Sequence, residues 1–131
     1  MSNRFQTQGD FSWTELMTRD VDAAKAFYRA VLGWVLEDVD MPSGPYTVIK
    51  AGSEQVGGMM RMPDKVPAGA PPHWATYVTA QDVDAVAAKA GEHGGAILVP
   101  PTDTPGVGRF CTFRDPQGAV LSAISYVPQA E

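Results

Sequence analysis

Asp-Val-Asp-Ala occurs at residues 20–23, and the same four residues return at 82–85, about half of the chain later. A repeat at this spacing indicates internal duplication, which decides the architecture of a chain. The two halves stay in register beyond the tetrapeptide, because Gly33 aligns with Gly95 and each ends an apolar-periodic stretch. The sequence therefore predicts two copies of one structural unit.

Each copy begins with an alternating segment rich in aromatic and β-branched residues, which is typical of a strand. An Asp at the N-cap position then opens a helix with one apolar face, and glycine ends it. Three more strand-like segments follow each helix, so the modules are βαβββ, at about 9–62 and 73–127, with a proline-rich connector at 63–72. The predicted strands are Phe11–Thr18, Trp34–Asp40, Pro45–Ala51 and Gln55–Arg61, then His73–Thr79, Ala96–Val99, Gly108–Arg114 and Ala119–Tyr126.

Composition narrows the class of protein. The chain has 131 residues, of which 44% are hydrophobic and 19% charged, and this is typical of one globular domain. A net charge of −5 argues against nucleic acid as the main partner, because phosphate binding needs a concentrated basic surface. No apolar run is long enough to cross a bilayer, and residues 1–10 lack an export signal. With a single cysteine, Cys111, these features predict a cytoplasmic protein without a membrane partner.

Two motifs add to the duplicated βαβββ pattern. The first helix ends in the segment from Ala26 to Trp34, which reads AFYRAVLGW, and an Asp115-Pro-Gln-Gly118 turn precedes the last strand. Together they resemble the vicinal oxygen chelate superfamily, which includes glyoxalase I, extradiol dioxygenases, fosfomycin-resistance proteins and bleomycin-binding proteins. Residues 13–20 further resemble its glyoxalase-like branch. The resemblance implies an α+β fold in which two tandem βαβββ modules form curved mixed sheets around a shared cleft.

Metal-dependent members of that superfamily hold a divalent ion with His, Glu or Gln from the first and fourth strand of each module. Carried over by alignment, these four positions fall at Trp13, Gly58, Ala75 and Ser122. Indole, hydrogen and methyl groups donate no lone pair to a hard cation, and one serine hydroxyl is a poor substitute for carboxylates and imidazoles. The resemblance therefore implies a degraded metal site, and no cofactor is expected.

A shift of two residues in this alignment keeps a strand side chain on the same face and makes Glu15 and His73 the fallback metal ligands. A catalytic ion normally takes three protein ligands, but a divalent ion held by these two residues stays open as the alternative. Glu15 has two further interpretations. It is either a catalytic base in a desolvated cleft, or a partner of Arg61 or Arg114 that only holds the sheet together.

Aromatic and soft apolar residues on the predicted strands are candidates for an organic ligand site, because a planar molecule binds in an apolar pocket with a few polar groups. A hydroxyl on the last strand adds one such polar group. The candidate ligand-binding residues are Phe11, Trp13, Tyr46, Met59, Tyr77, Phe110 and Ser122.

Two functions fit these residues. The first is a binding protein of the bleomycin-resistance type, which holds a small organic molecule in an aromatic-lined cleft. The second is a glyoxalase-like lyase or isomerase, or a dioxygenase-related enzyme, that uses a divalent metal or Glu15 as base. The degraded ligand positions favour the first, and enzymatic activity stays undecided. A third interpretation is a relic whose cleft is filled by its own side chains. A homodimer is expected by analogy with the family.

Overall fold

The computed structural model describes residues 3–42, 44–63 and 69–127. The chain forms two compact units, the first from residues 13–75 and the second from the residues before 13 and after 75. The boundary falls within two strands, so Phe11 and Ser12 belong to the second unit and His73–Ala75 to the first. Half of the predicted connector at 63–72, residues 64–68, lies outside the described residues.

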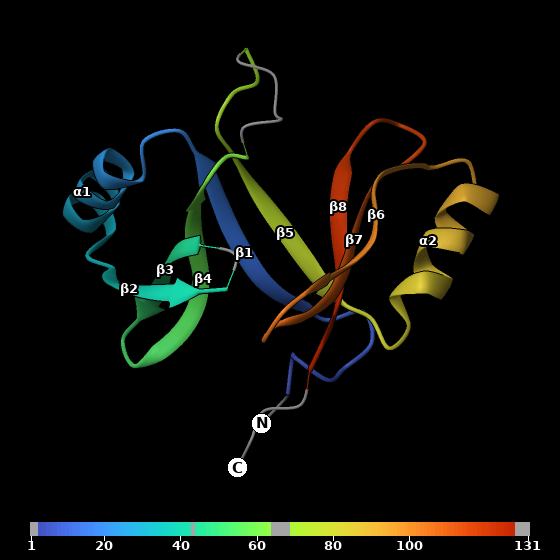
Figure 1. Ribbon diagram of the computed structural model, residues 1–131, viewed down its shortest axis with the longest axis horizontal. Helices are drawn as coiled ribbons and strands as arrows, with labels where there is room; N and C mark the ends of the chain where they lie inside the picture. The colour runs from blue at the N-terminus through green and yellow to red at the C-terminus, as the bar shows by residue number, and fades with distance from the viewer. Residues whose placement is uncertain (1–2, 43, 64–68, 128–131) are drawn as a thin grey trace. The chain divides into compact units, whose positions relative to one another are not determined.

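The first unit is built on a four-stranded mixed sheet (Figure 1). The strand order is β2-β3-β4-β1, with β4 and β1 parallel and the other neighbours antiparallel. Its elements in chain order are β1 (Phe11–Thr18), α1 (Val21–Leu32), β2 (Val35–Met41), β3 (Gly44–Ala51) and β4 (Glu54–Arg61).

The second unit repeats this plan in the order β5-β8-β7-β6, with β5 and β8 parallel. Its elements are β5 (His73–Thr79), α2 (Val83–Glu92), β6 (Ala96–Thr104), β7 (Gly108–Arg114) and β8 (Val120–Tyr126). The predicted α+β class and the βαβββ order of both modules are confirmed. Among the described residues, no helix has the length and apolar character needed to cross a membrane.

One predicted strand ends too early. The predicted strand ended at Val99, but β6 continues through Pro100 and Pro101 to Thr104. Register shifts between Ile97 and Thr102 absorb the prolines, and β6 stands at the end of its sheet order, where a missing N–H need not interrupt a ladder. The other predicted strand bounds agree with the structure to one residue.

The repeated tetrapeptide is a repeated helix cap. Oδ1 of Asp20 accepts a hydrogen bond from the Ala23 amide at 2.9 Å, and Oδ1 of Asp82 accepts one from the Ala85 amide at 3.1 Å. Each satisfies an amide that has no partner inside its helix. At the other end of α1, Gly33 takes a left-handed conformation with φ of 69°, which a side chain would disfavour.

Each helix is also tied to its own sheet by an ion pair. Nζ of Lys25 on α1 lies 2.8 Å from Asp38 of β2, and its hydrogen bond, together with one from Thr47, lowers the pKa of the Asp38 carboxyl. In the second unit, Arg109 of β7 binds Asp84 of α2 at 3.0 Å and lowers the pKa of that carboxyl. These contacts are exposed, so they orient the helices more than they stabilise them.

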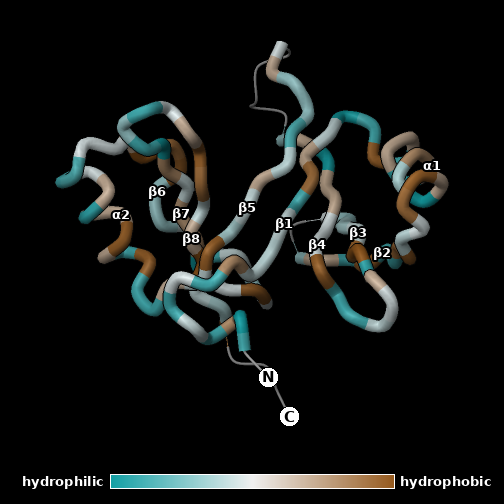
Figure 2. Tube along the Cα trace, turned by 180° about the vertical axis from the view of Figure 1, so that it is seen from behind, coloured by the Kyte–Doolittle hydropathy of each residue, from teal (hydrophilic) through white to brown (hydrophobic). Residues whose placement is uncertain are grey.

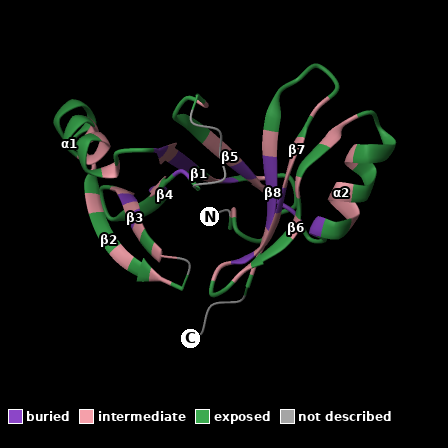
Figure 3. Ribbon diagram, turned by 45° about the horizontal axis from the view of Figure 1, so that its top comes forward, coloured by how far each residue is buried: buried purple, intermediate pink, exposed green. Residues whose placement is uncertain are grey.

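The apolar cores lie between each helix and its sheet. In the first unit, Leu16, Ile49 and Met59 pack against residues of α1, and in the second, Cys111 and Ala123 pack with Val83 of α2. Both helices carry hydrophobic and hydrophilic residues in alternation (Figure 2), and buried residues concentrate on the strands (Figure 3). Burial raises the pKa of the Cys111 thiol. One face of each sheet therefore carries the core of its unit.

The cap at Asp20 gives a first prediction. The variant Asp20→Ala is expected to lose about 1 kcal/mol of unfolding free energy, because the Ala23 amide loses its acceptor. Urea denaturation measures the loss. Asp22→Asn is the matched control, since Asp22 lies in the first turn but caps no amide here, and it should lose less than half as much. Equal losses in the two variants would contradict the assignment of the cap.

Candidate functional site

The candidate site lies on the face of the first sheet that points away from α1. Glu15 of β1 is paired in register with Gly58 of β4, and Gly58 with Val48 of β3. Because side chains alternate along a strand, Trp13, Glu15 and Tyr46 share this face, whereas Leu16 and Met59 turn toward the helix.

Tyr46 joins the other two side chains. Its hydroxyl donates a hydrogen bond to Oε1 of Glu15 at 2.7 Å and accepts one from Nε1 of Trp13 at 2.9 Å. Glu15 is only 7% exposed, so the phenol supplies a donor to a carboxylate largely removed from water. We call Trp13, Glu15 and Tyr46 the indole–phenol–carboxylate triad.

Gly58 makes room for the triad. A Cβ atom built on Gly58 would overlap the hydroxyl and ring of Tyr46, so the phenol lies directly over the glycine Cα. Gly58 is not among the glycines with positive φ, and the requirement is therefore one of space. Any side chain at residue 58 would displace Tyr46.

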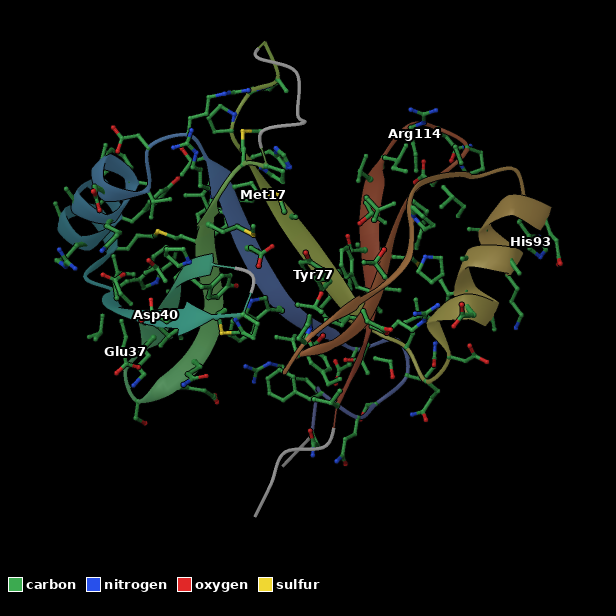
Figure 4. All side chains as sticks on the ribbon, in the orientation of Figure 1. Met17, Glu37, Asp40, Tyr77, His93 and Arg114 are labelled. Carbon is green, nitrogen blue, oxygen red and sulfur yellow. The ribbon has the colours of Figure 1, made fainter. Side chains whose placement is uncertain are left out.

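The second unit carries a related but different group. Tyr77 of β5, which Figure 4 labels, is paired in register with Ser122 of β8. The ring of Phe110 meets the Tyr77 ring edge-on, with 6.2 Å between the ring centroids. Ser122 is 3% exposed, and its hydroxyl lies 2.7 Å from the hydroxyl of Thr112. Phe110 aligns with Tyr46 but has no hydroxyl, so it cannot join two side chains by hydrogen bonds as Tyr46 does.

The structure separates the remaining candidates from these two groups. Met59 is fully buried in the core under α1, on the opposite side of the sheet from Tyr46. Phe11 is 68% exposed and belongs to the second unit. His73 is exposed, and its Nδ1 lies 3.2 Å from the carbonyl oxygen of Pro71.

The model of the Glyoxalase/Bleomycin resistance protein/Dioxygenase superfamily matches residues 10–122. The chain belongs to this superfamily. It is 44% identical over 122 residues to the protein named "Putative glyoxylase CFP32" of Mycobacterium tuberculosis, a match that covers 92% of this chain and 46% of the relative. It is 34% identical over 116 residues to the anthracycline biosynthesis protein DnrV of Streptomyces peucetius, covering 88% of this chain and 41% of the relative. The chain thus spans about half the length of these curated relatives or less.

A solved structure shows the same fold. The methylmalonyl-CoA epimerase of Mycobacterium tuberculosis superposes with a TM-score of 0.66 at 14% identity, over 94% of this chain and 92% of the epimerase. The resemblance to the vicinal oxygen chelate superfamily is therefore confirmed at the level of both family and fold.

Three of the four positions that align with metal ligands of the superfamily are engaged in contacts within the protein. The Trp13 indole donates its N–H to Tyr46, Gly58 lies under the Tyr46 ring, and Ser122 is hydrogen-bonded to Thr112. Within residues 3–42, 44–63 and 69–127, no three His, Cys, Asp or Glu side chains are grouped so that they could hold a metal ion. The residues present at these positions do not fit a divalent ion.

Sequence reasoning selected Trp13, Glu15 and Tyr46 but did not connect them. The available signal was Gly58, because a glycine inside a strand marks close approach of another group. Tyr46 aligned with Phe110 was the second signal, since a hydroxyl gained in one copy needs a polar partner.

The contact between Gly58 and Tyr46 is tested by a double-mutant cycle. Gly58→Ala should destabilise the protein by about 1–3 kcal/mol, because the methyl group forces the phenol out of its place. In a Tyr46→Ala background most of this loss should disappear, and urea denaturation gives both values.

Gly91→Ala is the control for that cycle. A Cβ there meets open space on α2, so alanine should stabilise the helix by up to about 1 kcal/mol with no dependence on Tyr46. A Gly58→Ala loss that is the same with and without Tyr46 would show that the ring does not lie over the glycine.

Proposed function

We propose that this member of the glyoxalase superfamily binds a small organic molecule without a divalent ion, against the face of the first sheet that carries the triad. The observation that carries the proposal is the Tyr46 ring over Gly58. At a position where metal-dependent relatives place a ligand side chain, this chain has no side chain, and a phenol fills the space.

The triad has the chemical character of a binding surface. Trp13 and Tyr46 are partly buried aromatic rings, which provide contact area with little loss of side-chain freedom. The hydrogen bonds from Trp13 to Tyr46 and from Tyr46 to Glu15 fix both rings before any ligand arrives. A preformed surface of this kind favours affinity, because less order has to be imposed on binding.

An enzyme is the second candidate, and one observation favours it. Glu15 is buried and hydrogen-bonded to a phenol at 2.7 Å, which is the arrangement of a carboxylate that exchanges a proton with a neighbouring acid. In this alternative, the Glu15 carboxylate removes a proton from a carbon atom of the ligand. The Tyr46 hydroxyl, which donates a hydrogen bond to Glu15, orients that carboxylate. The name "Putative glyoxylase" of a 44% identical relative supports an enzymatic role.

The proposal keeps two expectations from the sequence, a cytoplasmic setting and a homodimer. Cys111 is a buried free thiol, which a reducing compartment preserves. Exposed apolar residues on and after α1 support self-association, because such residues are costly to leave in water. They are Phe27, Val31, Leu32 and Val35.

Metal content separates the binding protein from a metal-dependent enzyme. Protein purified without chelator should contain less than about one tenth of a divalent ion per chain, as measured by plasma mass spectrometry. Dialysis against a chelator should leave the melting temperature unchanged, because no ion stabilises the folded state. A near-stoichiometric ion that is lost in Glu15→Gln would overturn the metal-free proposal.

Ligand binding is tested by thermal-shift screening with planar aromatic and dicarbonyl compounds. A compound at 100 times its Kd should stabilise the fold by about 2.7 kcal/mol. For a compound bound at the triad face, Trp13→Leu should abolish the shift, whereas Thr14→Phe should keep it, because Thr14 is the next residue of β1 and faces the other side of the sheet. A screen in which no compound gives a shift that depends on Trp13 contradicts the proposed face.

The same compounds decide between binding and catalysis. Each is incubated with the protein and followed by NMR for product, and the binding proposal expects none. If product forms and Glu15→Gln slows it by about 100-fold or more, Glu15 is the general base and the enzyme replaces the binding protein.

A further inference from the structure

A cavity of about 360 Å³ lies on the other side of the first sheet from the triad. It is lined by Thr14, Trp34, Ile49, Val56, Gly57 and Trp74. Thr14 and Ile49 are paired in register with Gly57, so their side chains point away from the face of Glu15 and Gly58. No residue of the triad contributes to this cavity.

Two tryptophans form a corner in the cavity wall. The Trp34 and Trp74 rings lie 5.9 Å apart at 74° to each other. Tyr28 of α1 holds both, since its ring stacks on Trp34 at 5.5 Å and its hydroxyl accepts a hydrogen bond from Nε1 of Trp74 at 3.3 Å. The corner is therefore preformed by packing.

We propose that this cavity is a second small-molecule site, distinct from the triad face, and that it takes a planar aromatic compound. A flat ring stacked on one indole meets the other indole at a steep angle, and aromatic rings favour both the offset-stacked and the edge-to-face arrangement. The volume falls in the range of small-molecule pockets, about 300–1,000 Å³.

The second unit shows that the fold does not require this cavity. Gly57 aligns with Leu121, and Trp34 aligns with Ala96, so the second unit has a large side chain where the first has none and a methyl where the first has an indole. A smaller pocket of about 110 Å³ beside α2 includes Phe113, which aligns with Ile49, but not Ala96 or Leu121, so it lies elsewhere in its unit. Gly57 and the two tryptophans thus create a feature specific to one copy.

Exposure of the wall agrees with a site for a ligand from solution. Trp74 is 38% exposed and Val56 is 36% exposed, so the cavity opens to water within its own unit. Leaving an indole partly in water is unfavourable, and a stacked ring covers it. A second copy of this chain could cover the same residues, and the test below separates the two occupants.

The probe is 2-naphthol, followed by NMR through the indole Nε1–H resonances of the three tryptophans. The Trp34 and Trp74 resonances should shift on titration, whether or not the Trp13 resonance, on the opposite face, also shifts. Thr14→Phe fills the cavity and should weaken binding by about tenfold or more, whereas the isosteric Thr14→Val should change Kd by less than about twofold. Phenylalanine suits an exposed strand residue, and Trp74→Leu provides a second variant with the same expected loss if Thr14→Phe fails to fold.

Three outcomes overturn the proposal. The first is a shift of Trp13 alone, which assigns the probe to the triad face. The second is equal affinity in Thr14→Phe, Trp74→Leu and Thr14→Val. The third is a sedimentation-velocity result in which the wild type is a dimer and Thr14→Phe a monomer, which assigns the cavity to a second copy of the chain. The Trp13 resonance reports on the triad face independently of Trp34 and Trp74. Failure of the second site therefore does not count against the function proposed for the triad face, which the thermal-shift screen tests.

Discussion

The contact between the Tyr46 ring and the bare Cα of Gly58 is the constraint on which the candidate site depends. It places the phenol between Trp13 and Glu15, and it fills the space from which a fourth-strand metal ligand would project. A larger residue at 58 would remove the phenol, and without the phenol the buried carboxylate would lose a donor. One missing side chain therefore links the packing of the sheet to the chemistry of its open face.

Strand alternation gives the first sheet two chemically different surfaces. Neighbouring residues of β1 serve opposite sides, since Trp13 and Glu15 belong to the triad while Thr14 lines the cavity near α1. The core under α1 uses only part of the helix side, around Leu16, and the remainder stays open. The chain thus presents polar aromatic chemistry on one face and an indole corner on the other.

Most of the fold could be predicted from the sequence. The helix caps and the alternation of apolar and polar residues along the strands are local signals, and the internal duplication makes each of them appear twice. The end of β6 could not be predicted in this way. Prolines usually end an interior strand, but Pro100 and Pro101 are tolerated in β6 because the register shifts there. The superfamily was readable from the same signals in combination. Residues of the site were identified, but their contacts were not, because the position of Tyr46 over Gly58 depends on the register between β3 and β4.

The same limit explains Met59 and the tryptophans. Met59 was expected at the ligand, but one step of alternation places it in the core, and a sequence does not say which face a helix will cover. Trp34 and Trp74 were not proposed as site residues, because they are far apart in the chain and only the fold brings their rings to 5.9 Å.

The adjacent glycines of β4 have a thermodynamic consequence. A side chain at residue 57 would overlap the main-chain carbonyl of Thr14, and one at residue 58 would overlap the Tyr46 ring, so both positions require glycine. Each glycine loses more backbone entropy on folding than alanine would, which costs roughly 0.5–1 kcal/mol. The duplicate strand β8 has Leu121 and Ser122 there and is spared this loss. The second copy keeps side chains along its last strand, whereas the first accepts a less stable backbone there so that the Tyr46 ring and the Thr14 carbonyl can approach it closely.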